Sequence, residues 1–224
     1  MSLNDTDVFK KRLREVFVNL SDHQVEKLAK YRELVCEEQK TQNLTKLLSV
    51  EDFLWGHIAD CVETIKNIHL EYPVLDLGSG GGVPGIPLAI LSEDSEQNTQ
   101  QWILSESENN KAEFLKRAVS ELGLSKKVAV SSERAEKLLK KTPVATVVTR
   151  AVGTVSKIYA LLRPCSTWNK LLLYKGPGWD KEWLDFQEAY KNKDLNIDLV
   201  HDYVLGDKSR RLILLSRQNV PRRT

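Results

Sequence analysis

The sequence predicts an α/β protein in which a mostly parallel β-sheet follows a helical amino-terminal region. Apolar residues recur every three or four positions through residues 5–69, which is the spacing of amphipathic helices. After Pro73, short β-type runs alternate with helical segments, and this alternation is typical of βαβ units around a parallel sheet. The first of these runs leads directly into a glycine-rich turn. We therefore expect a helical region at 1–70 and a sheet domain at 71–224.

The helical region should contain three helices. Ser21 followed by Gln24 predicts a capping box at the start of the second helix, because each side chain can bond the backbone amide of the other residue. A third helix is expected from about Val50. Its apolar face would be formed by Phe53, Leu54, His57, Ile58, Cys61, Val62, Ile65 and Ile68.

The sheet domain should contain parallel strands, each followed by a helix, and a final antiparallel pair that turns at Gly206. A polar insertion at 93–100 separates the first helix from the second strand. The predicted strands are 74–77, 102–105, 128–131, 144–148 and 170–174, the predicted helices lie near 85–92, 110–122, 133–141, 154–163 and 179–191, and the closing pair is 197–204 with 210–216.

Composition indicates a compact protein of the cytoplasm with no membrane segment and no metal site. Of the 224 residues 41% are hydrophobic, which suffices for a buried core. No apolar run approaches the roughly 18–20 residues that cross a bilayer, and the amino-terminal segment is charged, unlike a signal peptide. Cys36, Cys61 and Cys165 lie far apart and outside any Cys or His cluster, so neither disulfides nor a zinc site are expected.

Basic residues are concentrated near the carboxyl terminus. The chain as a whole has a formal net charge of +2, but six basic residues and one acid, Asp207, follow Gly206. Such a run either contacts phosphates of a nucleic acid or remains a solvated tail, and the sequence leaves both interpretations open. The six residues are Lys208, Arg210, Arg211, Arg217, Arg222 and Arg223.

The strongest local signal is a glycine-rich segment between the first predicted strand and the helix after it. The segment reads VLDLGSGGGVPG and places Gly78, Gly80 and Gly82 in a G-x-G-x-G spacing. Glycines allow backbone amides at a helix amino terminus to approach a ligand closely. The alternative is a tight turn with a structural role alone.

Two details favour a methyl donor over a dinucleotide as the ligand of this loop. A dinucleotide-binding turn has the spacing G-x-G-x-x-G and places a pyrophosphate at the helix amino terminus, whereas the spacing after Gly78 differs. Asp76 would repel a pyrophosphate but could hold the ammonium group of S-adenosylmethionine, directly or through water. We therefore expect S-adenosylmethionine as the cofactor.

Glu106 is a second candidate ligand residue, at the end of the second predicted strand. A carboxylate at this position can accept hydrogen bonds from both ribose hydroxyls of an adenosine. This would support nucleoside binding without distinguishing S-adenosylmethionine from NAD. The alternative is an ordinary surface glutamate beside Glu108.

Beyond the glycines, the sequence resembles the GidB/RsmG family of bacterial ribosomal RNA guanine-N7 methyltransferases. The stretch DLGSGGGVPGIPLAI carries the most specific part of this likeness, which extends from about Ser21 to Leu215. The resemblance implies a Rossmann-like class I methyltransferase sheet, S-adenosylmethionine as methyl donor, and a guanine N7 in 16S ribosomal RNA, free or in the small ribosomal subunit, as acceptor. The other matching motifs are Asn43-Leu44-Thr45, His57, Asp60, Thr149-Arg150-Ala151 and Lys175-Gly176.

The resemblance also implies which residues face the cofactor. It places Glu106 on the ribose, Ala135 and Glu136 beside the adenine, and Arg150 at the cofactor site. Gly78 and Val83 match its glycine-loop positions, and Gly80 lies between them in the same loop. Departures from the family pattern are Gly81 for proline, Thr149 for serine, Glu106 for aspartate and Asn110 for a basic residue.

The residues after the fourth predicted strand disfavour methylation of an exocyclic amine. Such enzymes carry an Asn/Asp-Pro-Pro-aromatic turn there, whereas this chain has Thr149-Arg150-Ala151. Pro164-Cys165 resembles the nucleophile pair of pyrimidine C5 enzymes, but its place in or near the fourth helix of the sheet domain favours a structural cysteine. Guanine N7 carries a lone pair and no proton at neutral pH, so its methylation needs alignment and no catalytic base.

Several roles remain open from the sequence. Arg150 could bond guanine O6 and Lys175 a phosphate, while His57 and Asp60 are expected to dock the helical region onto the sheet rather than to contact substrate. The alternative functions are a non-catalytic ribosome-assembly factor, a small-molecule methyltransferase and a nucleotide-dependent dehydrogenase. The last of these is disfavoured by Asp76 and the loop spacing.

Overall fold

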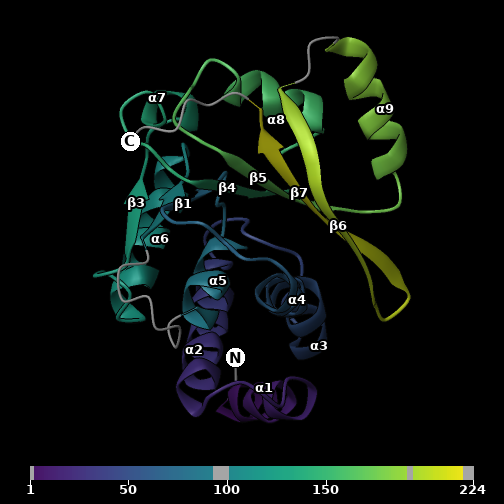
Figure 1. Ribbon diagram of the computed structural model, residues 1–224. Coiled ribbons are helices and arrows are strands. Elements are labelled where there is room, and N and C mark those ends of the chain that lie inside the picture. The colour runs from purple at the N-terminus through teal and green to yellow at the C-terminus, as the bar shows by residue number, and fades with distance from the viewer. Residues whose placement is uncertain (1–2, 93–100, 191–193, 219–224) are drawn as a thin grey trace.

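The structure, a computed structural model, describes residues 3–92, 101–190 and 194–218. Its centre is a seven-stranded sheet with the order β3-β2-β1-β4-β5-β7-β6 (Figure 1). Strands β1 to β5 are parallel, and β7 runs antiparallel to both β5 and β6. The strands are β1 Val74–Leu77, β2 Trp102–Ser105, β3 Val128–Ser131, β4 Thr146–Arg150, β5 Lys170–Lys175, β6 Leu195–Leu205 and β7 Lys208–Arg217.

Helices cover both faces of the sheet, and successive residues of a buried strand point to opposite faces. In β5, Leu172 joins a core under the amino-terminal helices, α5 and α6, whereas Leu171 and Leu173 join a core under α7, α8 and α9 (Figure 1). This double burial explains the nearly continuous apolar runs that predicted the strands. The helices are α5 Gly85–Leu91, α6 Asn109–Glu121, α7 Ala135–Leu138, α8 Val155–Leu162 and α9 Trp179–Ala189.

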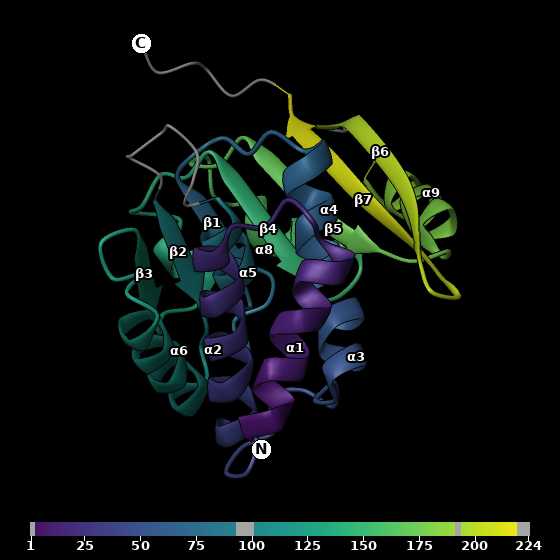
Figure 2. The same ribbon diagram turned by 90° about the horizontal axis from the view of Figure 1, so that it is seen from below.

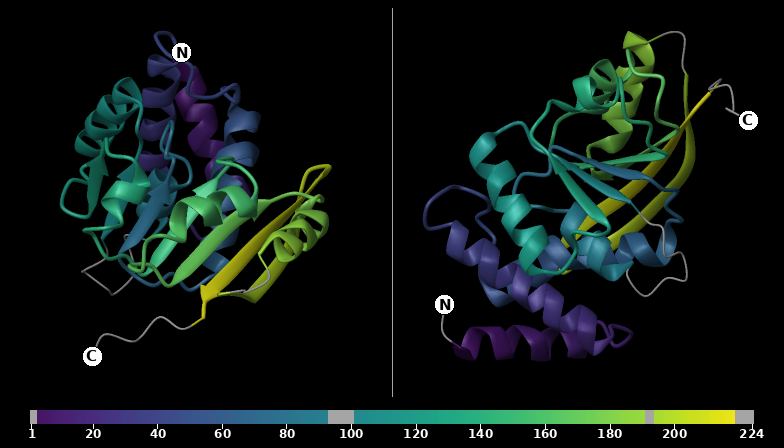
Figure 3. Two further views of the ribbon diagram at one scale, coloured as in Figure 1. Left: turned by 90° about the horizontal axis from the view of Figure 1, so that it is seen from above. Right: turned by 90° about the vertical axis from the view of Figure 1, so that its left-hand side faces the viewer.

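The amino-terminal helices form an outer layer on one face of the sheet (Figure 2). The capping box at Ser21 and Gln24 is confirmed, with both reciprocal bonds present at the start of α2. Helix α1 packs against α2 on the side away from the sheet (Figure 3). The elements are α1 Leu3–Val16, α2 Asp22–Glu38, α3 Val50–Phe53, the π-helical segment η1 Leu54–Ile58 and α4 Ala59–Asn67.

The continuous third helix expected from Val50 is interrupted in the structure by the π-helical turn η1. Gly56 lies inside this turn, and a Cβ atom there would lie 2.5 Å from Cδ1 of Leu47. In this turn the chain lies close to Leu47, and the ring of His57 is bonded to Arg150 at the end of β4. Single π-helical turns of this kind are frequent at functional sites.

Most predicted elements are found, with shifted ends. Strand β4 begins two residues later than predicted, at Thr146, where the amides of Ala145 and Thr146 both donate to the carbonyl of Pro73. The predicted helix at 133–141 is reduced to α7, and its last residues form turns. The closing antiparallel pair is confirmed and longer than predicted.

One hydrophobic core contains side chains of the amino-terminal helices together with side chains of the sheet, so the division at residue 70 stays a prediction. The polar insertion at 93–100, the last residue of the helix predicted at 179–191, and Arg222 and Arg223 lie outside the described residues. Among the helices that are described, none has the length and apolar character needed to span a membrane. The described residues also contain no cluster of three His, Cys, Asp or Glu side chains suited to a metal ion.

Candidate active site

A cavity of about 350 Å³ opens at the carboxyl ends of β1, β2 and β4, between the glycine loop and the helical region. The strand order reverses at β1, because β2 and β4 flank it on either side, and such switch points are where open α/β sheets bind ligands. The volume lies within the range of small-molecule sites. Among the residues that line the cavity are Tyr31, Thr45, His57, Gly78, Ser79, Gly80, Gly81, Glu106, Lys111 and Arg150.

The glycine loop forms one wall of the cavity through its backbone. Gly78 has a φ of +72°, and a Cβ atom there would lie 2.7 Å from Cγ2 of Val152. Its amide and that of Ser79 donate to the carbonyl of Ser105 at 3.0 and 3.1 Å, which ties the loop to the end of β2. The loop is thus held by bonds that require glycine geometry at this position.

Asp76 lies beneath the glycine loop and is not part of the cavity wall. Its side chain is fully buried, and Oδ2 accepts a hydrogen bond from the amide of Gly85 at 3.0 Å. Burial raises the pKa of this carboxyl to about 7, against the opposing effect of the Gly85 bond. Its other oxygen, Oδ1, has no hydrogen-bond partner among the described residues, and the ammonium contact expected from the sequence, direct or through water, stays a prediction. In the structure Asp76 anchors the first turn of α5.

Glu106 lies where the sequence expected it, at the end of β2 and on the cavity wall. One carboxylate oxygen accepts from the amide of Gly80 at 2.9 Å, and the other accepts from the amide of Glu108 at 2.8 Å. Each carboxylate oxygen has a second lone pair, so these bonds leave acceptor capacity for a ligand. Its assignment to ribose hydroxyls stays a prediction.

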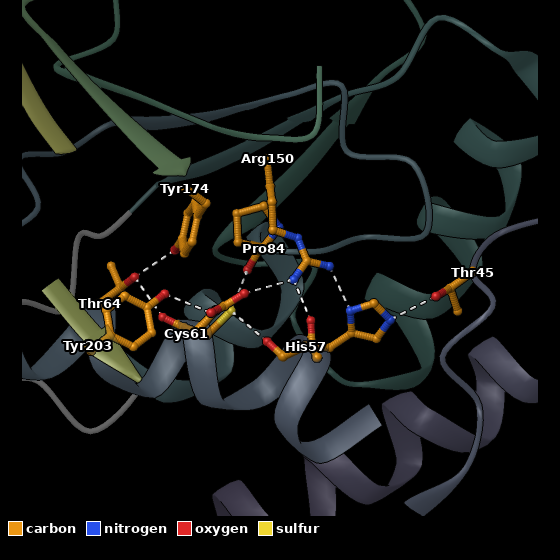
Figure 4. A network of polar contacts seen from close by, with 10 residues as sticks. Thr45, His57, Cys61, Thr64, Pro84, Arg150, Tyr174 and Tyr203 are labelled. Atoms are coloured by element: carbon orange, nitrogen blue, oxygen red, sulfur yellow. Dashed lines mark hydrogen bonds and ion pairs between the residues drawn. The ribbon is translucent and has the colours of Figure 1, made fainter. Parts of the chain in front are cut away.

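The opposite wall is a network of side chains centred on Arg150, the last residue of β4 (Figure 4). Its guanidinium donates to His57 Nδ1 at 2.6 Å, to the carbonyl of Gly56 at 2.6 Å and to Asp60 Oδ2 at 3.2 Å. The Arg150 side chain is 19% exposed and that of Asp60 is 4% exposed. His57 and Asp60 thus link the helical region to the end of β4, as expected, and the preference for this role over substrate contact stays a prediction.

Burial and the neighbouring Arg150 charge together lower the pKa of His57 to about 3, with burial the larger cause. A neutral ring suits this position, because the guanidinium needs an acceptor at Nδ1. His57 is thus neither a base nor a cation at physiological pH. The nearby thiol of Cys61 is fully buried, and burial raises its pKa well above the usual range, so it is no nucleophile.

The network continues from the cavity to the closing strands (Figure 4). Tyr203 of β6 donates to Asp60 Oδ1 at 2.7 Å, and Tyr174 of β5 shares a 2.7 Å hydrogen bond with Thr64. Sequence reasoning missed both tyrosines. It also missed Tyr31, whose hydroxyl donates to the carbonyl of Gly81 at 2.6 Å, because a tyrosine at an apolar helix position resembles an ordinary core residue.

Four other predicted residues lie outside the cavity. Ala135 and Glu136 begin α7 beyond the end of β3, so an adenine contact would require the ligand to extend past Glu106. Lys175 donates to the carbonyl of Gly153 at 2.9 Å and to Glu182 at 2.6 Å, and a phosphate would have to displace these partners. Cys165 is buried with its thiol against the carbonyl of Glu136, in agreement with a structural cysteine.

Comparison with known proteins gives one family. The family model GidB, described as rRNA small subunit methyltransferase G, matches residues 24–212. The protein named ribosomal RNA small subunit methyltransferase G in Brachyspira hyodysenteriae is 34% identical over 202 residues, which cover 89% of this chain and 94% of that protein. Its namesake in Rhodopirellula baltica is 34% identical over 199 residues, or 88% and 83% of the two chains.

A solved structure extends the likeness to the fold. TrmK of M. capricolum, in complex with S-adenosyl-homocysteine, aligns with a TM-score of 0.54 and 12% sequence identity. The alignment covers 70% of this chain and 67% of that one. At this identity the match shows the Rossmann-like methyltransferase fold, and the sequence prediction of that fold is confirmed.

Proposed function

The chain belongs to the GidB family of rRNA small subunit methyltransferases, and from this premise we propose that it transfers a methyl group from S-adenosylmethionine to N7 of a guanine in 16S ribosomal RNA. The observation that carries the proposal is the cavity at the strand switch point. There the backbone wall of the glycine loop and the carboxylate of Glu106 face the Arg150 network. The substrate would be the RNA itself or an assembling small subunit.

The residues present fit S-adenosylmethionine. Gly78, Gly80 and Val83 would pack against the cofactor, and Glu106 would accept hydrogen bonds from ribose hydroxyls. Ala135 and Glu136 would border the adenine, and Arg150 would lie at the amino-acid end. When bound, the cofactor supplies an electrophilic methyl group on a positively charged sulfur.

The chemistry needs orientation and no proton transfer before attack. Guanine N7 presents a lone pair and carries no proton at neutral pH, so the residues of the site would have only to hold the base in line with the methyl group of the donor. His57 is kept neutral, and both of its ring nitrogens lie within hydrogen-bond distance of side chains of the protein. Alignment of the two reactants would then supply most of the rate enhancement, on the order of 7–11 kcal/mol.

The basic residues of the closing strands contribute unequally to any RNA contact. Arg211 pairs with Asp180 at 2.6 Å and with Asp202, and Arg217 lies over the ring of Trp168. These two side chains therefore have roles inside the protein. Lys208 and Arg210, together with Arg222 and Arg223 of the prediction, remain the candidates for phosphate contacts.

Mass mapping of 16S ribosomal RNA from cells with and without this gene tests the proposal. We expect one 7-methylguanosine to disappear with the gene and to return with the wild-type chain, but not with Glu106→Ala. Unchanged methylation in the deletion strain would contradict the proposal. Stoichiometric RNA binding without methyl transfer by the purified protein would instead indicate an assembly factor.

A further inference from the structure

The cavity wall opposite the glycine loop carries a hydroxyl whose hydrogen-bond direction is set by its neighbours. Thr45 lies in the segment after α2 and lines the cavity. Figure 4 shows its side chain at the end of a chain of contacts that runs from Arg150 through His57. Because Arg150 can only donate hydrogen bonds, it determines which atom donates and which accepts in each of these contacts.

Arg150 fixes the tautomer of His57. A guanidinium has only donors, so Nδ1 of His57 must accept the 2.6 Å bond from Arg150. In a neutral imidazole the ring hydrogen is then on Nε2. Burial keeps the ring neutral, with a pKa of about 3, so this arrangement holds at physiological pH.

The fixed tautomer in turn determines what the Thr45 hydroxyl can do. The Nε2–H group of His57 donates to Thr45 Oγ1 at 3.0 Å, and the amide of Leu47 donates to the same oxygen at 3.1 Å. These two bonds occupy both lone pairs of the hydroxyl oxygen. Its own hydrogen is left to donate, and no acceptor for it is found among the residues that the structure describes. Because Thr45 lines the cavity, the hydrogen is available to a bound molecule.

We propose that Thr45 is a positioning residue that donates this hydrogen to the carboxylate of the amino-acid part of S-adenosylmethionine. The inference rests on the proposed function. Charge supports this choice of acceptor, because the same wall carries the Arg150 guanidinium and the carboxylate is the one anionic group of the cofactor. Glu106, across the cavity, suits the neutral ribose hydroxyls. The acceptor atoms of a guanine are neutral and would gain less from this wall.

Calorimetry with two ligands isolates the proposed contact. S-adenosylhomocysteine has the amino-acid carboxylate, whereas 5′-methylthioadenosine shares the nucleoside and lacks that group. Thr45→Val removes the hydroxyl and keeps the shape. We expect it to weaken binding of S-adenosylhomocysteine about 10- to 100-fold, as for a lost hydrogen bond to a charged group, and to leave methylthioadenosine unchanged. Thr45→Ser should restore the affinity to within about threefold.

A matched control is Thr41→Val in the same segment, whose hydroxyl donates to the carbonyl of Glu38 outside the cavity. This variant should bind both ligands like the wild type. Equal weakening of both ligands by Thr45→Val would overturn the proposal, as would an unchanged affinity for S-adenosylhomocysteine. Failure of the wild-type protein to bind either ligand would instead contradict the proposed function.

Nitrogen NMR of the wild-type protein tests the inference even if Thr45→Val does not fold. The chain has four histidines, so the His57 signals can be assigned by substitution. We expect a neutral His57 ring with its hydrogen on Nε2 from pH 6 to 8. A ring with its hydrogen on Nδ1, or a protonated ring, would reverse the direction of the bonds and overturn the proposal.

Discussion

The two walls of the cavity face each other but are built by different interactions. The glycine loop is a backbone structure, in which the amides of Gly78 and Gly80 bond to the end of β2 and to Glu106, 27 and 26 positions away. The opposite wall is a side-chain structure, in which Arg150 joins residues 90 to 94 positions away. One wall therefore depends on the backbone shape of consecutive residues, whereas the other depends on a buried charge and its partners.

The difference explains what the sequence could predict. Strands β1 to β3, the glycine turn and Glu106 were predicted closely, because their signals are local spacings of apolar residues and glycines. The sequence did not predict the contact of Arg150 with His57 and Asp60, because the spacing of these three residues along the chain does not indicate that they meet in the fold. Resemblance identified these residues, and only the fold gives their contacts.

The π-helical turn η1 is another feature that periodicity could not predict. The apolar residues of 50–68 fit a continuous helix, and a single wider turn hardly changes that pattern. The contacts of this turn are with distant parts of the chain, since Gly56 packs closely against Leu47 and its carbonyl accepts a hydrogen bond from Arg150. The burial of Asp76 could not be predicted from the sequence either. Its position before the glycine loop suggested a ligand contact, and only the fold shows that its side chain is buried beneath the loop.

Removal of the Arg150 charge should disrupt the side-chain wall, and we expect it to have the largest effect on stability. Arg150→Met leaves the buried Asp60 carboxylate with Tyr203 as its remaining side-chain donor. We expect the free energy of unfolding, measured by urea denaturation, to fall by about 3–5 kcal/mol. The double variant Arg150→Met/Asp60→Asn should recover part of this loss. A loss below about 1 kcal/mol in the single variant would show that the wall does not depend on the charge.

Gly85→Ala should break the backbone wall by crowding. The new methyl group would lie 2.3 Å from Cδ2 of Leu104 and 2.6 Å from Oδ2 of Asp76, so α5 and the loop before it must shift. Thermal or urea unfolding should show a loss of about 1–3 kcal/mol, with weaker cofactor binding. Gly176→Ala, where no atom lies within 4 Å of the new carbon, should change stability by less than about 0.5 kcal/mol. Equal effects of the two substitutions would contradict this account.

The pH dependence of stability should separate the two walls, because the pKa values of two buried groups are shifted in opposite directions: that of His57 in the side-chain wall and that of Asp76 beneath the glycine loop. His57 has a pKa of about 3 in the folded protein against an ordinary 6.5. Below pH 6.5 the unfolded chain binds a proton that the folded protein does not, so the contribution of His57 to stability is complete above pH 6.5 and is lost as pH falls. Asp76 has a folded pKa of about 7 against an ordinary 3.8, so stability is lost as pH rises through that interval. Between about pH 4 and 6.5 the two contributions oppose each other.

Single substitutions should separate the two contributions. Asp76→Asn removes the loss of stability with rising pH, so in this window its free energy of unfolding should rise more steeply with pH than that of the wild type. His57→Gln removes the opposite contribution, so its slope should be lower than that of the wild type. Each change of slope should approach about 1.4 kcal/mol per pH unit. Urea denaturation at half-unit pH steps measures these slopes. Parallel pH profiles for the two variants would show that the groups do not have the opposite shifts described above.

In the proposed reaction the two walls align a guanine N7 with a methyl donor, and no residue removes a proton before attack. Its most direct test is single-turnover methyl transfer to 16S ribosomal RNA transcribed with guanosine or with 7-deazaguanosine, which replaces N7 by carbon and keeps Watson–Crick pairing. We predict transfer to the guanosine RNA at a rate that is nearly constant from pH 6 to 8.5, and no transfer to the deaza RNA. Comparable methylation of the deaza RNA would contradict the account.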